Sequence, residues 1–252
     1  MNKKFAFTLA EVFSSHFDSR RKHAFTLAEV LVALTVVGII SAITVPTLMN
    51  KSTKKSQAAL IHKAYVELSD AVELYMNDED SQKVSGPFAD LDKVEYFLTH
   101  YYRVNKNCKS DPVGGGCLSA TFSTISGSTG QKHSNGPYAS PTNFKCIQDK
   151  AGITVCMCKN KGVHNATQAT DDYHSADLID VWFDTNGAEL PNIKGRDIFR
   201  IYINSEGDLV TWDETESKYD QRETQFNNGC ISSSDPDGCI GKLLNDNWEM
   251  NY

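Results

Sequence analysis

Hydrophobic residues form one long block near the N-terminal end of the chain. From Phe25 to Val45, 21 residues include a single charged side chain, that of Glu29. A helix of this length is about 31 Å long, which matches the roughly 30 Å hydrocarbon core of a bilayer. Basic residues 20–22 come directly before the block, and such charge keeps that end of a membrane helix in the cytoplasm. The pattern therefore predicts one transmembrane helix at about residues 25–45, with the remaining chain exported.

The spacing of hydrophobic residues stays helical after this block but becomes amphipathic. Hydrophobic positions recur at steps of three and four residues, which predicts a helix with one apolar face. The polar run that starts at Asn77 ends the pattern, so we expect one helix over residues 25–77. Pro46 lies inside it and lacks a backbone donor, which loosens the preceding turn. The apolar positions of the second half are Leu60, Ile61, Ala64, Tyr65, Leu68, Val72 and Tyr75.

Short strands replace helices in the second half of the chain. A second helix is expected over residues 88–104, and residues 105–141 read as a loop rich in Gly, Ser, Thr and Asn. Short β-branched and aromatic segments with turn signals between them then predict an antiparallel meander. The fold class is α+β, with the amphipathic half of the long helix packed on this C-terminal sheet. The expected strands are 144–149, 153–159, 178–184, 198–203 and 208–212, and a last element spans 241–252.

The seven cysteines all lie in the exported part and suit disulfides formed in an oxidising compartment. A three-residue turn with Gly152 in the left-handed position joins the first two strands of the meander. That register places Cys146 opposite Cys156, within reach of a disulfide, and leaves Cys158 as the odd thiol. A Cys146–Cys158 bridge after a register shift is the alternative. The other expected bridges are Cys108–Cys117 and Cys230–Cys239.

The charge distribution argues against direct binding of nucleic acid. The net charge is −7, from 25 basic and 32 acidic residues. Residues 1–24 hold five of the basic and two of the acidic side chains, so the rest of the chain carries 20 against 30, a net charge of −10. An acidic body is a poor match for a phosphate backbone.

The order of charge, small residue and hydrophobic block differs from that of an ordinary secretory signal, in which cleavage follows the apolar core. Here Ala24 lies between the basic cluster and the block, followed by Phe25, Thr26, Leu27, Ala28, Glu29 and Val30. This arrangement resembles the signal of type IV pilins and type II secretion pseudopilins. The resemblance implies that a prepilin peptidase cuts between Ala24 and Phe25 and methylates the new amine of Phe25. The family usually has Gly where this chain has Ala24.

The resemblance also implies a function. Residues 1–24 would be a leader, residues 25–77 the long pilin-like helix and residues 78–252 an exported globular domain. The chain would be a structural subunit of a pilus or a secretion pseudopilus, not an enzyme. It would lie in the bacterial inner membrane with a single span, its C-terminal domain periplasmic or extracellular, and then enter a filament. Its partners would be copies of itself, other pilin-like subunits, the prepilin peptidase and an inner-membrane assembly platform.

Glu29 would meet the N-terminal amine of a neighbouring subunit in such a filament, since pairing lessens the cost of a buried charge. The alternative is that Glu29 only reaches back to the membrane interface. The rival class of function is a membrane-anchored exported enzyme or binding module that uses a pilin-like anchor.

The leader contains an earlier copy of the same motif. Residues 6–12 and 24–30 both read AFTLAEV, but only the second copy leads into the hydrophobic block. The residues after the first copy are too polar to span a membrane. We therefore expect the second copy to be the working site and Ala6/Phe7 to be a remnant or a decoy.

A run of oxygen-bearing side chains follows the third strand of the meander. Residues 180–197 resemble the C-terminal segment of some bacterial pilin-like proteins, and major pseudopilins often bind calcium in a C-terminal loop. Calcium takes carboxylate and amide oxygens, but the spacing here is not that of an EF-hand. Ordinary turn residues on a solvated surface are the favoured interpretation, and no other cofactor is expected. The candidate calcium ligands are Asp184, Asn186, Glu189 and Asp197.

Two further residue clusters are weaker candidates for a redox or metal site. Cys156 and Cys158 are one residue apart, which is not the spacing of a redox or zinc motif, so a disulfide and a bystander thiol are favoured. A polar loop is favoured over a metal site for the second cluster. That cluster consists of His164, Asp171, Asp172 and His174. The sequence contains no phosphate-binding glycine loop and no GxSxG or HExxH motif.

Overall fold

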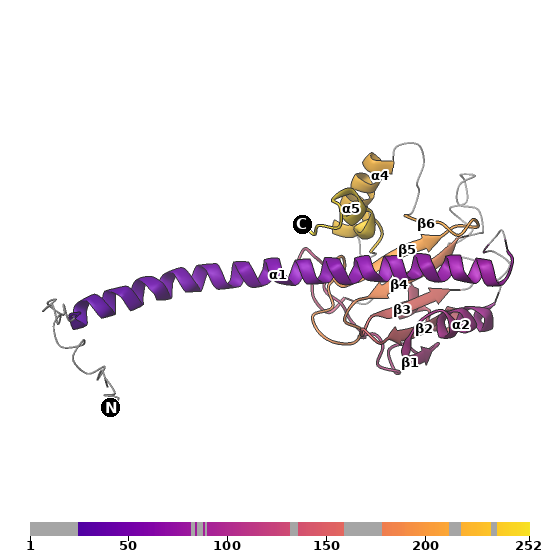
Figure 1. Ribbon diagram of the computed structural model, residues 1–252, viewed down its shortest axis with the longest axis horizontal. Coiled ribbons are helices and arrows are strands. Elements are labelled where there is room, and N and C mark those ends of the chain that lie inside the picture. Colours follow the sequence, from indigo (N-terminus) through magenta and orange to yellow (C-terminus); the bar gives the residue numbers. More distant parts are fainter. Residues whose placement is uncertain are drawn as a thin grey trace, which may run out of the picture. The chain divides into compact units, whose positions relative to one another are not determined.

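The computed structural model describes residues 25–81, 84, 88, 90–131, 136–158, 178–211, 218–232 and 236–252. The chain divides into two units, residues 1–49 and residues 50–252, and each is described by itself. Helix α1, Leu27–Asp78, contributes to both units (Figure 1). It begins two residues later and ends one residue later than the sequence indicates. The leader and the candidate cluster at residues 164–174 lie outside the described residues.

The part of α1 in the first unit is apolar and continues through Pro46. Its three threonines hide their hydroxyl groups by donating to main-chain carbonyls four residues earlier, at 2.8 to 3.1 Å. This bonding suits an apolar surrounding, because no hydroxyl proton is left without an acceptor. By length and composition α1 is able to cross a membrane.

The second unit is built on a six-stranded antiparallel sheet in which every strand pairs with its neighbours in sequence. This meander confirms the predicted topology. The strands are β1 Val104–Lys109, β2 Phe144–Asp149, β3 Thr154–Cys158, β4 Ile179–Asp184, β5 Ile198–Ile203 and β6 Leu209–Val210. Cys146 pairs with Cys156 in the β2–β3 register, as the hairpin turn predicts.

Both faces of the central strands are covered, and every residue of β3, β4 and β5 is buried. One face packs with the second half of α1, whose buried positions include the small residues Ala58, Ala64 and Ala71. Small side chains let the helix backbone come close to the sheet. The other face, which includes Trp182 and Cys158, forms a separate core with Phe122 from the long loop.

Two expectations for residues 88–141 are wrong in detail. Helix α2 spans Leu91–His100 and not residues 88–104, because the Asp90 side chain caps its start by accepting from the Lys93 amide at 2.9 Å. Residues 104–109 form strand β1 and not a loop. β1 is an edge strand with two register irregularities and mostly exposed polar side chains, a composition typical of protected sheet edges.

The C-terminal region is more helical than the sequence predicts. Helix α4, Lys218–Gln225, runs into the π-helix η2, Phe226–Ile231, and helix α5 spans Cys239–Asn245. The expected last element at residues 241–252 is therefore helical only in its first part, and its helix begins earlier. Two short elements, α3 Gly136–Ala139 and η1 Pro141–Asn143, precede β2.

Three disulfides close short loops in the second unit. They join Cys108 to Cys117, Cys146 to Cys156 and Cys230 to Cys239, and Cys158 is the free cysteine, buried in the sheet. These are the pairs that the spacing and the hairpin register indicate, and the alternative Cys146–Cys158 bridge is absent. The bridges tie β1 to the loop after it, β2 to β3, and η2 to α5.

Candidate functional site

The start of α1 is held by a reciprocal pair of side-chain contacts between Thr26 and Glu29. The Thr26 amide and hydroxyl both donate to Oε2 of Glu29, at 2.8 and 2.9 Å, and the Glu29 amide donates back to the Thr26 hydroxyl at 3.3 Å. Thr26 precedes the first helical residue and Glu29 is the third residue of the helix, so the two form a capping box. A negative charge at this end also opposes the positive end of the helix dipole.

This capping box reduces the number of hydrogen-bond donors that Glu29 needs from other molecules inside a membrane. Oε2 is satisfied by its own chain, whereas Oε1 makes no hydrogen bond within the described residues. One carboxylate oxygen is thus hydrogen-bonded within the chain, while the charge stays in place and the other oxygen is left to accept from elsewhere. The sequence motif places a carboxylate here but does not reveal the capping box.

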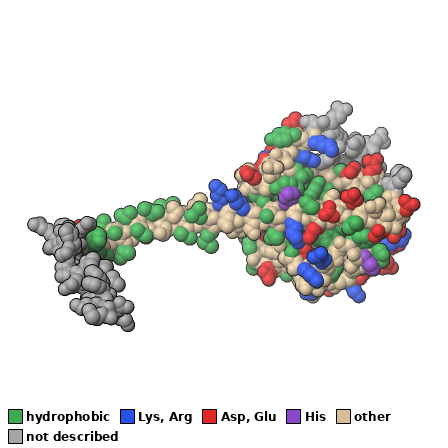
Figure 2. Space-filling view, in the orientation of Figure 1, with side chains coloured by type: hydrophobic (Ala, Val, Ile, Leu, Met, Phe, Trp, Pro, Cys, Tyr) green, Lys and Arg blue, Asp and Glu red, His purple; other side chains and the backbone are tan. Residues whose placement is uncertain are grey.

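The remainder of the apolar stretch is uncovered. Phe25 is 83% exposed and lies before the helix. Hydrophobic side chains line this stretch of α1, as Figure 2 shows. None of residues 25–49 is buried within the described part of the chain. Such a surface requires lipid or other helices around it.

The match with known proteins falls on this same stretch. A family model described as the prokaryotic N-terminal methylation motif matches residues 19–45. The chain carries a prepilin-type methylation motif. This motif is the hallmark of type IV pilins and pseudopilins, and it contains Ala24, Phe25 and Glu29. No curated protein and no solved structure gives a significant match to the chain.

The methylation motif and the apolar helix together support an exported protein of the type IV pilin or pseudopilin kind that is anchored in the inner membrane. Proteins with this motif assemble with other pilin subunits. The family match ends at Val45 and does not include the globular unit.

The second candidate site is the loop between β4 and β5, which buries two carboxylates. Asp184 is 1% exposed and Asp197 is 0% exposed. Burial, and then the charge of Asp197, raises the pKa of Asp184 well above its ordinary value. Burial also raises the pKa of Asp197 to about 7, although the main-chain amide of Ile193 donates to it.

Two asparagine side chains supply acceptor oxygens to this loop, while their amide nitrogens are already bonded to main-chain carbonyls. The Asn186 amide nitrogen donates to the carbonyls of Glu189 and Pro191, at 2.7 and 3.0 Å, and that of Asn192 donates to Glu189 at 3.1 Å. With their nitrogens occupied, both side chains present their oxygens. Oδ1 of Asn186, Oδ1 of Asn192 and Oδ2 of Asp197 are buried and lack a hydrogen-bond donor. Buried acceptors without donors are rare in native proteins.

Three of the four candidate calcium ligands have buried side-chain oxygens in this region, and calcium binding there stays a prediction. Asp184 ends β4 and Asn186 and Asp197 lie in the loop after it, whereas the side chain of Glu189 is exposed and only its main-chain amide and carbonyl take part in the loop. Asn192 was missed because the Pro191-Asn192 sequence reads as a simple turn. The described residues hold no group of three or more His, Cys, Asp and Glu side chains that would bind a metal. A cation in this loop would thus depend on amide and carbonyl oxygens, which suit calcium.

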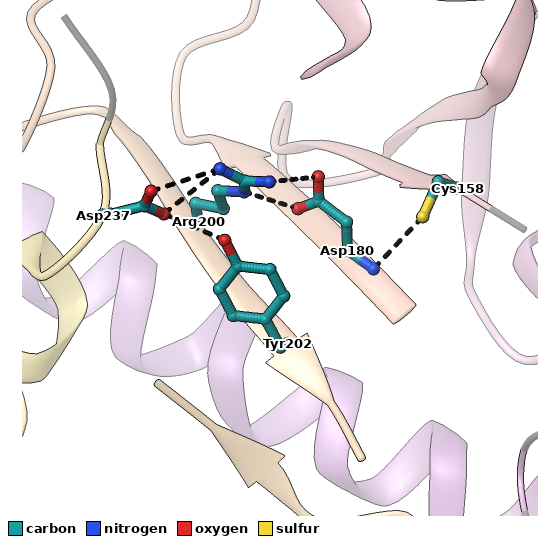
Figure 3. Close-up of polar contacts among 5 residues, drawn as sticks. All are labelled: Cys158, Asp180, Arg200, Tyr202 and Asp237. Atoms are coloured by element: carbon teal, nitrogen blue, oxygen red, sulfur yellow. Dashed lines mark hydrogen bonds and ion pairs between the residues drawn. The ribbon is translucent and has the colours of Figure 1, made fainter. Parts of the chain in front are cut away.

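A third polar cluster lies on the sheet face opposite α1 (Figure 3). Arg200 on β5 is paired with Asp180 on β4 and with Asp237 in the loop that the Cys230–Cys239 disulfide closes. The Tyr202 hydroxyl donates to Asp237 at 3.1 Å. The network joins the C-terminal loop to the sheet.

Cys158 lies at the edge of this network, but its thiol is not activated as a nucleophile. Its sulfur accepts the Asp180 amide at 3.2 Å. Burial, and then the charge of Asp180, raises the pKa of its thiol to about 12. The nucleophile of cysteine chemistry is the thiolate, so a thiol in this position is a poor nucleophile. Its neighbour Cys156 is occupied by a disulfide, which leaves no Cys156–Cys158 redox or metal pair.

Proposed function

We propose that this chain is a structural subunit of a type IV pilus or of a type II secretion pseudopilus. A prepilin peptidase removes residues 1–24, and the protein stays in the bacterial inner membrane through a single span until an assembly platform moves it into a filament. The globular unit is periplasmic or extracellular. The observation that carries this proposal is the Thr26–Glu29 capping box at the head of an uncovered apolar helix with the methylation motif.

The capping box suggests how the subunit assembles. Cleavage creates a positively charged amine at Phe25, one residue before the helix cap. Oε2 of Glu29 stays with Thr26 of its own chain, and Oε1 accepts the amine of a neighbouring subunit. An ion pair in lipid is favourable only when each charge keeps a partner. The local bond keeps Glu29 in place before the neighbour arrives, so the pair forms without reorganisation.

The state of the mature N-terminus tests the processing step. Mass spectrometry of the membrane-extracted protein should find a chain that starts at N-methylated Phe25. An Ala24→Gly variant, which restores the residue usual in the family, should be cut equally well. An intact leader in the mature protein would overturn the proposal and favour the membrane-anchored binding module or enzyme.

The assembly step has a matched control within the chain, because Glu11 occupies in the first copy of the motif the place that Glu29 occupies in the second. A Glu29→Ala variant should reach the membrane but be lost from filaments sheared from the cells. A Glu11→Ala variant should be incorporated normally. Normal incorporation of the Glu29 variant would exclude the assembly role.

We propose in addition that the β4–β5 loop binds calcium. Its support is the set of buried oxygens without donors on Asn186, Asn192 and Asp197, next to the buried carboxylate of Asp184. A divalent cation would offset the repulsion between the two carboxylates and satisfy the amide oxygens. Its role would be to order the loop, with no part in the processing of the N-terminus.

Terbium luminescence tests calcium binding directly, because aromatic side chains lie beside the loop. The Tyr138 hydroxyl is 3.5 Å from Asp184, and the Tyr138 and Trp182 ring centroids are 5.9 Å apart. Excitation of these rings should give terbium emission that calcium displaces. An Asp197→Asn variant should lose the emission, and Glu189→Gln, with an exposed side chain, should retain it. Absence of calcium-sensitive emission from the unmodified protein would exclude the site.

A further inference from the structure

The last residues of the chain lie along the part of α1 that belongs to the globular unit. The Trp248 indole stacks on the His62 ring with centroids 4.3 Å apart, and meets the Tyr65 ring edge-on at 5.1 Å. The ammonium of Lys54 donates to the main-chain carbonyl of Tyr252. Residues 247–252, named here the C-terminal strap, therefore contact α1 over three of its turns.

The strap is fixed to the globular unit at its other side. The Tyr252 hydroxyl donates to the Gly195 carbonyl at 2.8 Å, and its ring packs on Phe226 of η2 with centroids 4.8 Å apart. Met250 is buried between these two ends of the strap. The strap thus connects α1 with the β4–β5 loop and with the C-terminal helices.

The strap reaches α1 in a packed part and in an unpacked part, since His62 and Tyr65 lie beside the buried Ile61 and Ala64, whereas Lys54 precedes the buried face. No residue of the range 50–57 is buried, and the buried face of α1 begins at Ala58. Lys54 is the residue of this range for which the structure gives a contact to the strap. Local protection of a helix follows the contacts that cover it, so the Lys54 contact gives residues 50–57 a part of their protection.

The backbone of the strap is strained where it turns towards α1. Asn247 and Trp248 are consecutive residues in the left-handed region, with φ of 52° and 62°. Asn tolerates this conformation, but a bulky residue such as Trp adopts it rarely. Strained residues persist where the surrounding contacts determine their conformation. Here the contacts are the two aromatic pairs of Trp248 and the bond from its amide to the Leu243 carbonyl, at 2.7 Å.

We propose that the C-terminal strap is a conformational clasp on α1. In the closed state Trp248 sits on His62 and Tyr65 and keeps Tyr252 against Lys54, so that the strap protects residues 50–57. In the open state Asn247 and Trp248 relax out of the left-handed region, and the first turns of this part of α1 lose their protection while the sheet stays folded. This inference goes beyond the proposed function and does not depend on it, since the clasp lies within the globular unit.

Hydrogen exchange followed by mass spectrometry tests the clasp on the full-length protein in detergent. A Trp248→Ala variant should increase exchange in residues 50–60 by about tenfold, the order expected for the loss of two aromatic pairs. Exchange in the β2–β3 hairpin should not change. Tyr219→Ala, which removes an exposed aromatic ring on α4 away from the strap, should leave both regions as they are. Trp248→Phe should restore most of the protection.

Two further variants keep the test decisive. Asn247→Ala adds strain to the closed state, because Ala tolerates the left-handed region less well than Asn, and should speed exchange in residues 50–60. Tyr252→Phe removes only the bond to Gly195 and should raise exchange there by less than Trp248→Ala does. Unchanged exchange in residues 50–60 of the Trp248 variant would overturn the clasp. So would an equal rise across the whole sheet, because Trp248 would then be an ordinary core residue.

Discussion

The guanidinium of Arg200 faces the carboxylate of Asp180 in a two-pronged ion pair, with Nε and Nη2 each 2.8 Å from one oxygen (Figure 3). Both side chains are almost completely buried. The rings of Trp182 and Tyr202 lie 5.2 and 4.9 Å from the guanidinium carbon. The pair joins β4 to β5 in a place from which water is excluded, so its two members depend on each other.

Removal of one member of this ion pair should strongly lower the free energy of unfolding, although the pair lies away from the candidate sites. Asp180→Asn leaves a buried guanidinium with an incomplete partner and should lower the free energy of unfolding by about 3–5 kcal/mol. Urea denaturation followed by tryptophan fluorescence measures the change. Asp237→Asn is the control, because Asp237 is 27% exposed and lies 3.3 Å from Arg200, and its loss should be clearly smaller. Equal losses would contradict a dominant role for the Asp180 pair.

The Cys158 thiol should be inert in the folded protein. Burial raises its pKa to about 12, so almost no thiolate exists at pH 8 and the sulfur is out of reach of a reagent. A thiol reagent at pH 8 should label the folded chain slowly and should label one cysteine per chain after addition of denaturant. Rapid stoichiometric labelling without denaturant would show that the sheet opens around β3.

The sequence predicts most of the elements whose hydrophobic pattern is strong. α1 and the strands β2 to β5 fall within a few residues of their predicted bounds, because long apolar runs and Gly-containing turns determine them. β1 was missed because an edge strand exposes most of its side chains, and its polar residues resemble a loop. α4 was missed for a related reason, since none of its residues is buried and no apolar stripe marks it.

The candidate sites divide in the same way. The position of Glu29 follows from the motif. The bond from Thr26 to one of its two oxygens depends on the side-chain rotamer of Glu29, which the sequence does not show. In the β4–β5 loop, the sequence favours the carboxylate of Glu189 as a ligand, because Asn192 follows Pro191 and reads as part of a turn. In the structure the loop instead turns the Asn192 oxygen inwards and leaves the Glu189 side chain in solvent.

The Thr26 hydroxyl should matter for assembly to a lesser degree than Glu29. Thr26→Val removes the hydroxyl of the cap but keeps the main-chain bond to Oε2, and loss of a cap side chain costs about 0.5–2 kcal/mol. The yield of sheared filaments should fall, but by less than in Glu29→Ala. Thr35→Val is the matched control, because its hydroxyl bonds the Leu31 carbonyl of the same helix and does not touch Glu29. Equal filament yields from the two threonine variants would remove the capping box from the assembly step.

Asp197→Asn should change stability in opposite directions with and without calcium. The substitution keeps Oδ1, which accepts the Ile193 amide, and replaces Oδ2, a buried oxygen without a donor, by an amide nitrogen. It also removes the buried negative charge that Asp197 carries at pH 8, above its pKa of about 7. In EDTA the variant should therefore melt at a higher temperature than the unmodified protein. In excess calcium the unmodified protein should gain stability by binding, and the variant should gain little, so the order of the two melting temperatures reverses. Differential scanning calorimetry at pH 8 measures both, and a variant that is less stable in both buffers would show that the carboxylate has a structural role that needs no cation.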